Sequence, residues 1–214
     1  WYRPYAATEM KDVHYCFAFL LDPGTFHARS KRIVLPTDLK GMKVRPADGT
    51  IGAMVTMLGG TNVQASAPEA REVLDRGVAD AITFPWRSLI LFGIDKVTKH
   101  HMDLPLYSNT FVWVMNKAKY EAMSPAQKQV IDQHCTSEWA EKVATPWANW
   151  EHSGRELIAK EPGQDIYQLT PDQIAEWRKV GDQLRQRWAA KVPNADAAFA
   201  ALKADLKKHD ALAQ

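Results

Sequence analysis

The side chains that could carry catalysis are few in this sequence, and their spacing does not favour it. The one histidine pair is His100-His101, and neighbours on a strand point to opposite faces, so they cannot easily share a metal ion. His134 and Cys135 are also adjacent, but neighbours on a helix diverge, which argues against a cysteine–histidine nucleophile. The local motifs of serine hydrolases, nucleotide-binding loops, zinc peptidases and calcium loops are absent from the sequence. We therefore expect no enzyme, no catalytic residue, no metal site and no cofactor.

An arginine at the end of a predicted strand suggests a different chemistry, the binding of an anion. Thr37 or Asp38 can cap a single turn, and Gly41 allows the positive φ that ends it. The strand Met42–Arg45 follows and places Arg45 at its C-terminal end, which is where open α/β sheets bind ligands. A guanidinium stays charged and can donate two parallel hydrogen bonds to a carboxylate. A lone arginine is ordinarily a solvated surface charge, so position alone leaves both interpretations open.

Composition and charge are those of an ordinary globular protein. The 214 residues are 46% hydrophobic and 24% charged, and 27 Lys+Arg against 25 Asp+Glu give a net charge of +2. This near balance argues against nucleic acid as a partner, because phosphate binding needs a clustered basic surface. No apolar stretch is long enough to predict a membrane-spanning helix. The length fits one large domain or two smaller ones.

The start of the chain and its cysteines bear on the compartment. Trp1–Tyr5 lacks the apolar core of a signal peptide. The sequence also begins with aromatic residues in the middle of a sequence pattern, so we expect a processed or truncated chain. Cys16 and Cys135 are the only cysteines and lie far apart in sequence. They could pair in an oxidising compartment, but we expect two buried free thiols. The cysteines therefore do not settle the compartment.

Helix starts are marked by capping residues. Ser or Thr at the N-cap, Pro in the first turn and Gln or Glu three residues after the cap form a recurring pattern. The predicted starts are Ser124–Gln127, Thr170–Gln173, the close variant Ser66–Glu69 and, with a simple Asn cap, Asn194. From Ser124 to Lys160 we expect one long helix, or two joined by a kink near Pro146. Such a helix suggests an element that runs across two lobes.

The predicted strands are short and apolar. They are Val13–Leu21, Met42–Arg45, Ala79–Phe84 and Phe111–Met115. Strands that alternate with helices indicate an α/β protein with a mainly parallel sheet. After Thr170, apolar residues recur at helical spacing and include Trp177 and Trp188. We expect these aromatic residues to pack in the core and not to contact a ligand.

The segment Leu35–Arg45 resembles a hallmark of the solute-binding proteins of TRAP (tripartite ATP-independent periplasmic) transporters, the DctP type. In that family a Pro-x-Asp-Leu-Lys-Gly turn leads into a strand that ends in Arg. Three further segments resemble the family in the same order: Met57–Gly60, Glu69–Ala81 and Asn116–Pro125. The resemblance covers roughly Pro36 to Lys160, and the tail fits more loosely. It favours Arg45 as a ligand residue over a surface charge.

The resemblance implies a two-lobe periplasmic-binding-protein (Venus-flytrap) architecture with a long helix that spans the lobes. Family members begin with a longer N-terminal segment, so we expect the first lobe to be incomplete here. Residues 1–22 and 110–150 would be the remnant of lobe I with the long helix. Residues 23–109 and 151–214 would form lobe II. The lobes would close by hinge motion around a ligand.

The implied function is that of an extracytoplasmic, periplasmic receptor. It would capture an organic-acid carboxylate as a monomer and deliver it to the membrane subunits of a TRAP transporter, with no cofactor and no nucleic acid. A sensory system that presents the ligand to a receptor kinase would use the same fold. A periplasmic α/β enzyme is a further alternative, but it needs a nucleophile or metal site that the sequence does not display.

Departures from the family pattern bear on the ligand. Phe84 stands where the family often has an Asn that binds the ligand, and Trp86 follows it. We expect a ligand with an aromatic or branched apolar body, although both rings could instead pack in the core. Thr25 aligns with a second Arg of the sialic-acid-binding branch, which argues against a sugar acid. Tyr107 and Asn109 are further candidate polar contacts.

Overall fold

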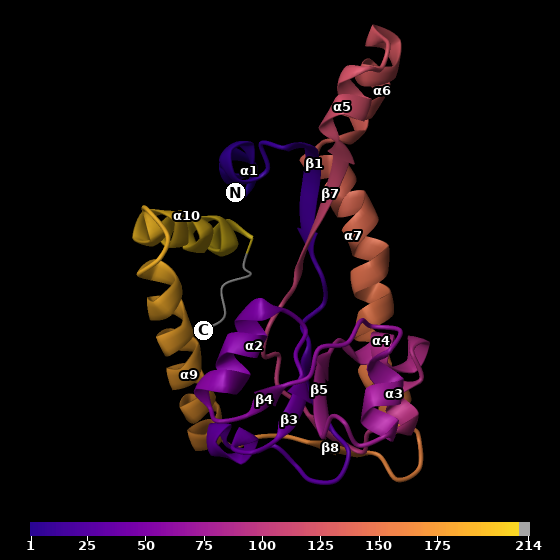
Figure 1. The fold of residues 1–214 in the computed structure, drawn as a ribbon, viewed down its shortest axis with the longest axis vertical. Helices are drawn as coiled ribbons and strands as arrows, with labels where there is room; N and C mark the ends of the chain where they lie inside the picture. The colour runs from indigo at the N-terminus through magenta and orange to yellow at the C-terminus, as the bar shows by residue number, and fades with distance from the viewer. Residues whose placement is uncertain (210–214) are drawn as a thin grey trace. The chain divides into compact units, whose positions relative to one another are not determined.

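The computed structural model describes residues 1–209, which form two compact units (Figure 1). Unit 1 comprises Trp1–Phe19, Phe111–Lys142 and residues 181–209. Unit 2 comprises Leu20–Thr110 and Val143–Val180. The sequence-based division put residues 151–214 in lobe II, whereas residues 181–209 group with unit 1 in the structure.

Unit 2 contains a six-stranded sheet with the strand order β4-β3-β5-β2-β6-β8. The strands are β2 (Thr25–Ala28), β3 (Lys43–Arg45), β4 (Thr61–Asn62), β5 (Ala81–Phe84), β6 (His100–Met102) and β8 (Asp165–Tyr167). The helices are η1 (Pro36–Leu39), α2 (Gly49–Met57), α3 (Ala70–Asp75), α4 (Trp86–Leu91), η2 (Ile94–Lys96), α8 (Gly154–Ala159) and parts of α7 (Ser137–His152) and α9 (Pro171–Ala189).

The sheet confirms the α/β class but is mixed in direction. Strand β3 pairs parallel with β4 and β5, and β6 pairs parallel with β8. The sequence analysis missed β2, which runs antiparallel to both β5 and β6. This central strand aligns Thr25 with Phe84. The start of β2 and the end of β5 therefore lie at the same edge of the sheet.

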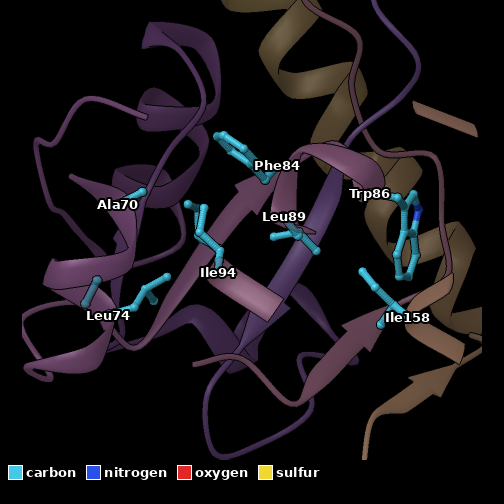
Figure 2. Close-up of a cluster of buried hydrophobic side chains, with 9 residues drawn as sticks. Ala70, Leu74, Phe84, Trp86, Leu89, Ile94 and Ile158 are labelled. Carbon is cyan, nitrogen blue, oxygen red and sulfur yellow. The ribbon is translucent and has the colours of Figure 1, made fainter. Parts of the chain in front are cut away.

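The core of unit 2 lies between β5 and the short helices that precede and follow it in the chain. Figure 2 shows this cluster of buried side chains. Its members come from α3, β5, α4, η2 and α8: Ala70, Leu74, Ala79, Ile82, Phe84, Trp86, Leu89, Ile94 and Ile158. Burial of apolar area of this kind contributes roughly 25 cal/mol per Å². The cluster fixes the C-terminal end of β5 and the start of α4.

The turn before β3 forms, but its cap position is Leu35 and not Thr37 or Asp38, because Asp38 lies inside the turn and bonds back to its start. The carboxylate of Asp38 accepts hydrogen bonds from the backbone N–H groups of Val34 and Leu35, each at 2.8 Å. Gly41 has φ +75°, a conformation that favours glycine because other residues place a Cβ against the following carbonyl. Lys43 N–H then donates to the carboxylate of Asp80 at 2.8 Å. These bonds set the position of β3 and of the residue at its end.

Unit 1 is built from a two-stranded sheet and helices. Strand β1 (Val13–Leu20) pairs with β7 (Thr110–Asn116). The last residue of β1, Leu20, and the first residue of β7, Thr110, belong to unit 2. Phe17 stacks on Trp113 with ring centroids 5.1 Å apart. The helices are α1 (Arg3–Glu9), α5 (Lys117–Glu121), α6 (Pro125–His134), the first part of α7, the last part of α9, and α10 (Ala195–Lys208).

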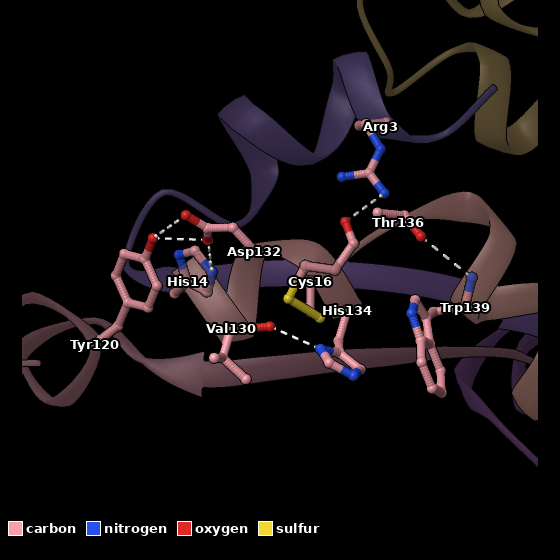
Figure 3. The surroundings of a disulfide bond; sticks show 10 residues. Arg3, His14, Cys16, Tyr120, Val130, Asp132, His134, Thr136 and Trp139 are labelled. Carbon is pink, nitrogen blue, oxygen red and sulfur yellow. Dashed lines mark hydrogen bonds and ion pairs between the residues drawn. A yellow bond between two sulfur atoms is a disulfide. The ribbon is translucent and has the colours of Figure 1, made fainter. Parts of the chain in front are cut away.

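Cys16 and Cys135 form a disulfide, so the expectation of two free thiols was wrong. The bond joins β1 to the residue that ends α6, across 119 residues of sequence. Figure 3 shows its surroundings, where Arg3 donates to the Cys135 carbonyl oxygen at 3.1 Å and His134 contacts the Val130 carbonyl oxygen. The sequence could not reveal this pairing, because it depends on a fold that brings two distant segments together.

We expect the disulfide to contribute strongly to the stability of unit 1. A cross-link that closes a loop of this length removes conformational freedom from the unfolded chain, which is worth about 2–4 kcal/mol. The double variant Cys16→Ser/Cys135→Ser should lose that much free energy of unfolding, measured by urea denaturation. Addition of dithiothreitol to the wild type should give the same loss. Equal stability of oxidised and reduced protein would contradict this prediction.

The predicted capping boxes form, but the long helix is interrupted elsewhere than expected. Ser124 and Thr170 each accept from the N–H of a Gln three residues later, at 3.3 Å in both cases. Pro146 lies exposed inside α7 and does not end that helix. The chain instead breaks at Cys135, whose ψ of +51° stops α6. Asn194 occupies the N-cap of α10, but its side chain makes no capping hydrogen bond, contrary to expectation.

Within residues 1–209, no helix combines the length and the apolar character that crossing a membrane requires. The long helices α7 and α9 carry charged residues throughout, which include Glu138, Lys142, Glu176 and Arg187. They are amphipathic elements of the two units.

Candidate functional site

Arg45 ends β3 and is the best candidate for an anion-binding residue. Its side chain is 9% exposed, and its Nε donates to the Ala65 carbonyl oxygen at 3.0 Å. Within residues 1–209 no carboxylate lies close enough to form an ion pair with it. A buried charge without a partner is costly, and proteins usually neutralise it by pairing. The guanidinium therefore retains donors that an anion could accept from.

The immediate surroundings of Arg45 are aromatic. The guanidinium carbon lies 5.5 Å from the centre of the Phe84 ring, within the range of a cation–π contact. Burial lowers the pKa of Arg45 from its usual value, while the neighbouring Tyr107 acts in the opposite direction. Arginine nevertheless remains protonated at every physiological pH. Phe84 thus orients a permanent positive charge at the edge of the sheet.

Two polar candidates lie at the same edge. Thr25 is opposite Phe84 in the sheet, is 1% exposed, and its hydroxyl has no hydrogen-bond partner among the described residues. Gly24 bridges to Tyr107, with Gly24 N–H donating to the Tyr107 carbonyl oxygen at 2.9 Å. A Cβ on Gly24 would lie 2.3 Å from the Tyr107 hydroxyl, so only glycine fits there. Burial raises the pKa of Tyr107, and contact with Thr83 partly opposes this shift.

The loop after Arg45 is fixed by two polar side chains. Ala47 N–H donates to the Thr83 hydroxyl at 2.8 Å, which ties the loop to β5. Asp48 caps α2 by accepting from Thr50 N–H and Ile51 N–H at 2.8 and 2.9 Å. An open cavity of about 520 Å³ runs beside this loop, and Arg45 lies in its lining. Sequence reasoning did not single out Thr83 or Asp48, since neither belongs to a recognisable motif.

The other two predicted contacts are placed differently. Trp86 is 8% exposed and packs edge-on against His27 with centroids 5.0 Å apart. In Figure 2 the rings of Phe84 and Trp86 point in different directions, and Trp86 lies beside Ile158. Asn109 contributes its backbone carbonyl oxygen to Leu21 N–H at 3.0 Å. The structure therefore brings Arg45, Phe84, Thr25 and Tyr107 to one end of the sheet, while Trp86, which belongs to the same buried cluster as Phe84, packs against His27.

Sequence reasoning also missed Glu151, a fully buried acid on α7. Its Oε2 accepts from the N–H groups of Arg87 and Ser88 at 2.9 and 3.0 Å, and its Oε1 accepts from the Ser88 hydroxyl. It thus satisfies the free N–H groups at the start of α4, just beyond Phe84. Gly154 permits this close approach, because a Cβ there would lie 2.2 Å from the Arg87 nitrogen. In sequence, Glu151 looks like any solvated acid on a helix.

The histidine pair His100-His101 is divided between two environments, as expected for neighbours on a strand. His100 Nδ1 contacts an Asp165 carboxylate oxygen at 2.7 Å, and His101 faces His27. Among residues 1–209, no group of three or more His, Cys, Asp or Glu side chains could hold a metal ion. The arrangement at the sheet edge can bind an anion through Arg45 and an apolar ring through Phe84.

Comparison with known families places these features in a wider context. Residues 7–191 match the family described as bacterial extracellular solute-binding protein, family 7. The match covers most of the chain and includes every residue of the sheet edge described above.

Three solved structures are similar to the chain over most of its length. A TRAP solute-binding protein from an unidentified marine microbe, specific for aromatic acid ligands and solved with metahydroxyphenylacetate, is 31% identical over 87% of this chain and 60% of its own (TM-score 0.78). A TRAP periplasmic solute-binding protein from Bordetella bronchiseptica, with bound (R)- and (S)-mandelate, is 25% identical over 94% of this chain and 66% of its own (TM-score 0.84).

The third comes from Rhodoferax ferrireducens T118 and holds copurified benzoate. It is 26% identical over 86% of this chain and 58% of its own, with a TM-score of 0.77. The chain thus spans about 60% of the length of the first of these structures. All three, like the matched family, are solute-binding receptors.

Proposed function

The chain belongs to family 7 of the bacterial extracellular solute-binding proteins, and on that premise we propose that it captures an aromatic carboxylate for a TRAP transporter. The residues proposed to bind the ligand are Arg45, Phe84, Thr25 and Tyr107. Arg45 would hold the carboxylate, and Phe84 would contact the ring. Asn109 remains a candidate polar contact, and Trp86 would support the site from the core.

The observation that carries this proposal is the state of Arg45. The side chain is buried, has no acidic partner among the described residues, and donates one hydrogen bond from Nε. A carboxylate would accept from the remaining donors and neutralise the charge, which supplies roughly 1.5–3 kcal/mol per charge-assisted bond. A surface arginine would not need such a partner.

Two observations support an aromatic ligand. Phe84 stands where the family resemblance places a polar contact, and its ring lies beside the guanidinium, so the proposed anion site would be bounded by a ring. An aromatic ligand in contact with it would gain about 0.5–1.5 kcal/mol beyond the burial of area. The relatives solved with metahydroxyphenylacetate, mandelate and benzoate each hold an acid with an aromatic ring.

The whole protein would act in the periplasm as a monomer. Capture would shift the protein toward a closed form in proportion to the ligand's preference for that form. The closed form would then dock on the membrane subunits of the transporter, which supply the energy for transport. No cofactor takes part in this cycle.

A thermal-shift screen of the full-length protein tests the proposed ligand class. The panel contains benzoate, mandelate and hydroxybenzoates, with succinate and malate as aliphatic acids and glucuronate as a sugar acid. We expect the aromatic acids to raise the melting temperature most. A screen in which only sugar acids or uncharged compounds stabilise the protein would contradict the proposal.

Phe84→Asn tests the part of the proposal that concerns the ring. The substitution removes the aromatic contact and provides an amide, so affinity for benzoate should fall about tenfold, which corresponds to about 1.4 kcal/mol. Affinity for succinate should stay equal or rise. Calorimetric titrations of both ligands measure this change. The aromatic proposal fails if the ranking of the two ligands is the same in variant and wild type.

A further inference from the structure

A pair of buried histidines lies directly beneath the sheet edge. His27 on β2 and His101 on β6 are both 0% exposed, and their Nδ1 atoms are 2.8 Å apart. The other nitrogen of His27 is 3.0 Å from the Phe84 carbonyl oxygen. The other nitrogen of His101 is 2.7 Å from Oε1 of Gln164. The two rings therefore form a chain of three polar contacts that runs from Gln164 to the Phe84 carbonyl oxygen at the end of β5.

These three contacts need three ring protons, one more than two neutral imidazoles carry. The Phe84 carbonyl can only accept, so His27 must donate to it from Nε2. Gln164 donates its amide N–H to the Asp95 carbonyl at 2.9 Å, so its Oε1 faces His101 and accepts from Nε2. Each ring thus uses one proton on Nε2, and the contact between the two Nδ1 atoms needs a third. Two neutral imidazoles carry only two ring protons.

Other placements of the two ring protons, or of the Gln164 amide, also leave one contact between two acceptors. If either ring carried its proton on Nδ1 alone, its Nε2 lone pair would face an oxygen. If the Gln164 amide were reversed, its oxygen would face the Asp95 carbonyl oxygen. A buried contact between two acceptors costs at least as much as a lost hydrogen bond. An imidazole–imidazolium pair satisfies every contact.

The contacts of the pair require the extra proton against the effect of burial. Burial lowers the pKa of both imidazoles, and the charge of His101 lowers the pKa of His27 further, whereas the hydrogen bond to the Phe84 carbonyl raises the pKa of His27 and the hydrogen bond to Gln164 raises that of His101. The carboxylates of Asp95 and Asp165 also raise the pKa of His101, and His100 opposes them. Asp95 is 3% exposed, and one of its carboxylate oxygens has no partner among the described residues. Its other carboxylate oxygen already pairs with the Lys96 ammonium at 3.1 Å, so Asp95 is a counter-charge that the pair shares with this lysine.

We propose that His27 and His101 share one proton and together form a buried cation that positions Phe84 at the ligand site. The shared proton makes the hydrogen bond from His27 to the Phe84 carbonyl charge-assisted, which shortens and strengthens it. It holds the end of β5, on which Phe84 lies beside Arg45. His27 and His101 are positioning residues, since neither reaches the sheet edge itself. Their role in binding rests on the proposed function, whereas the shared proton does not.

Nitrogen NMR of the ligand-free, full-length protein tests the shared proton directly. With histidine labelled by ¹⁵N at about pH 7.5, where a free imidazole is neutral, both Nε2 atoms of the pair should be protonated. The two Nδ1 atoms should report one proton between them. His100 provides the internal comparison on the same strand. Two fully unprotonated Nδ1 atoms at that pH would overturn the proposal, whether or not the protein binds a carboxylate.

Stability as a function of pH gives a second readout. Below about pH 6.5 the unfolded chain takes up a proton on each histidine, while the native pair holds only one, so stability should fall as the pH drops. Above about pH 7 the unfolded histidines are neutral while the native pair keeps its proton, so stability should also fall as the pH rises. The matched variant His101→Gln should lose the alkaline decline. A wild-type plateau above pH 7 would contradict a shared proton.

The positioning role is tested by comparing two neighbouring histidines. His101→Gln should weaken benzoate binding about tenfold and flatten the pH dependence of that binding. His100→Gln removes a histidine outside the pair and should change the affinity less than twofold. Equal affinity and an equal pH profile in His101→Gln and wild type would exclude a positioning role. If the wild type binds no carboxylate, the proposed function fails, and the NMR count still decides the state of the pair.

Discussion

Arg45→Ala should reduce the affinity of the full-length protein for benzoate by roughly a thousandfold. The guanidinium would donate two charge-assisted hydrogen bonds to the carboxylate, and each contributes about 1.5–3 kcal/mol in a buried site. Every 1.4 kcal/mol is a factor of about ten in affinity. Isothermal titration calorimetry of both proteins measures the loss.

Two controls separate binding from folding in this experiment. Arg45→Lys keeps the positive charge but not the planar pair of donors, so its affinity should lie between those of wild type and Arg45→Ala. Urea denaturation should show a smaller effect of Arg45→Ala on stability, about 1–3 kcal/mol, because the Ala65 carbonyl loses its donor. An unchanged affinity in a folded Arg45→Ala protein would remove Arg45 from the site.

Glu151→Ala should destabilise unit 2 by about 4 kcal/mol, the largest effect that we expect from a single substitution on stability. Glu151 is fully buried and accepts from two backbone N–H groups and one hydroxyl at the start of α4. Its removal leaves those donors without a partner in a site that water cannot easily enter, and each such loss costs about 1–3 kcal/mol. Urea denaturation followed by circular dichroism measures the change.

Glu156→Ala is the matched control for Glu151. Glu156 is an exposed acid five positions further along the chain, on α8, and its removal should change stability by less than about 0.5 kcal/mol. Glu151→Gln keeps an acceptor but loses the charge, so it should fall between the two. If Glu151→Ala were as stable as Glu156→Ala, the account of the α4 cap would be wrong.

Local features of the fold could be predicted because they depend on neighbouring residues. The capping boxes at Ser124 and Thr170 need only residues three positions apart, and both form. The turn that ends at Gly41 needs one positive φ and one acid, and it also forms. The position of Arg45 could be predicted from that turn, because β3 is three residues long and Arg45 is its last residue.

Features that depend on distant residues could not be predicted in this way. The disulfide between Cys16 and Cys135 requires β1 and the end of α6 to meet. Strand β2 is only four residues long, and all four are buried, so its polar residues Thr25 and His27 do not mark a solvated face. The chain breaks at Cys135, which ends α6, whereas Pro146 lies inside α7 without ending it.

The candidate site divides in the same manner. The strand patterns predicted the positions of Arg45 and Phe84 at one end of the sheet, whereas the packing of Trp86 against His27 was not predicted, and the roles of all three residues in binding stay predictions. Two residues after a strand end, the chain has already entered α4, so the direction of that side chain depends on tertiary packing. Glu151 and the His27–His101 pair were invisible for a related reason, because their roles come from burial.

The central claim is that a carboxylate, and not merely an aromatic ring, is the group that the protein recognises. Calorimetric titration of the full-length protein with benzoate and with benzamide tests it most directly, because the two ligands share a ring and differ in charge. The account predicts that benzoate binds at least about a hundredfold more tightly, since benzamide cannot neutralise the Arg45 guanidinium. Equal affinity for the two ligands, or tighter binding of benzamide, would contradict it.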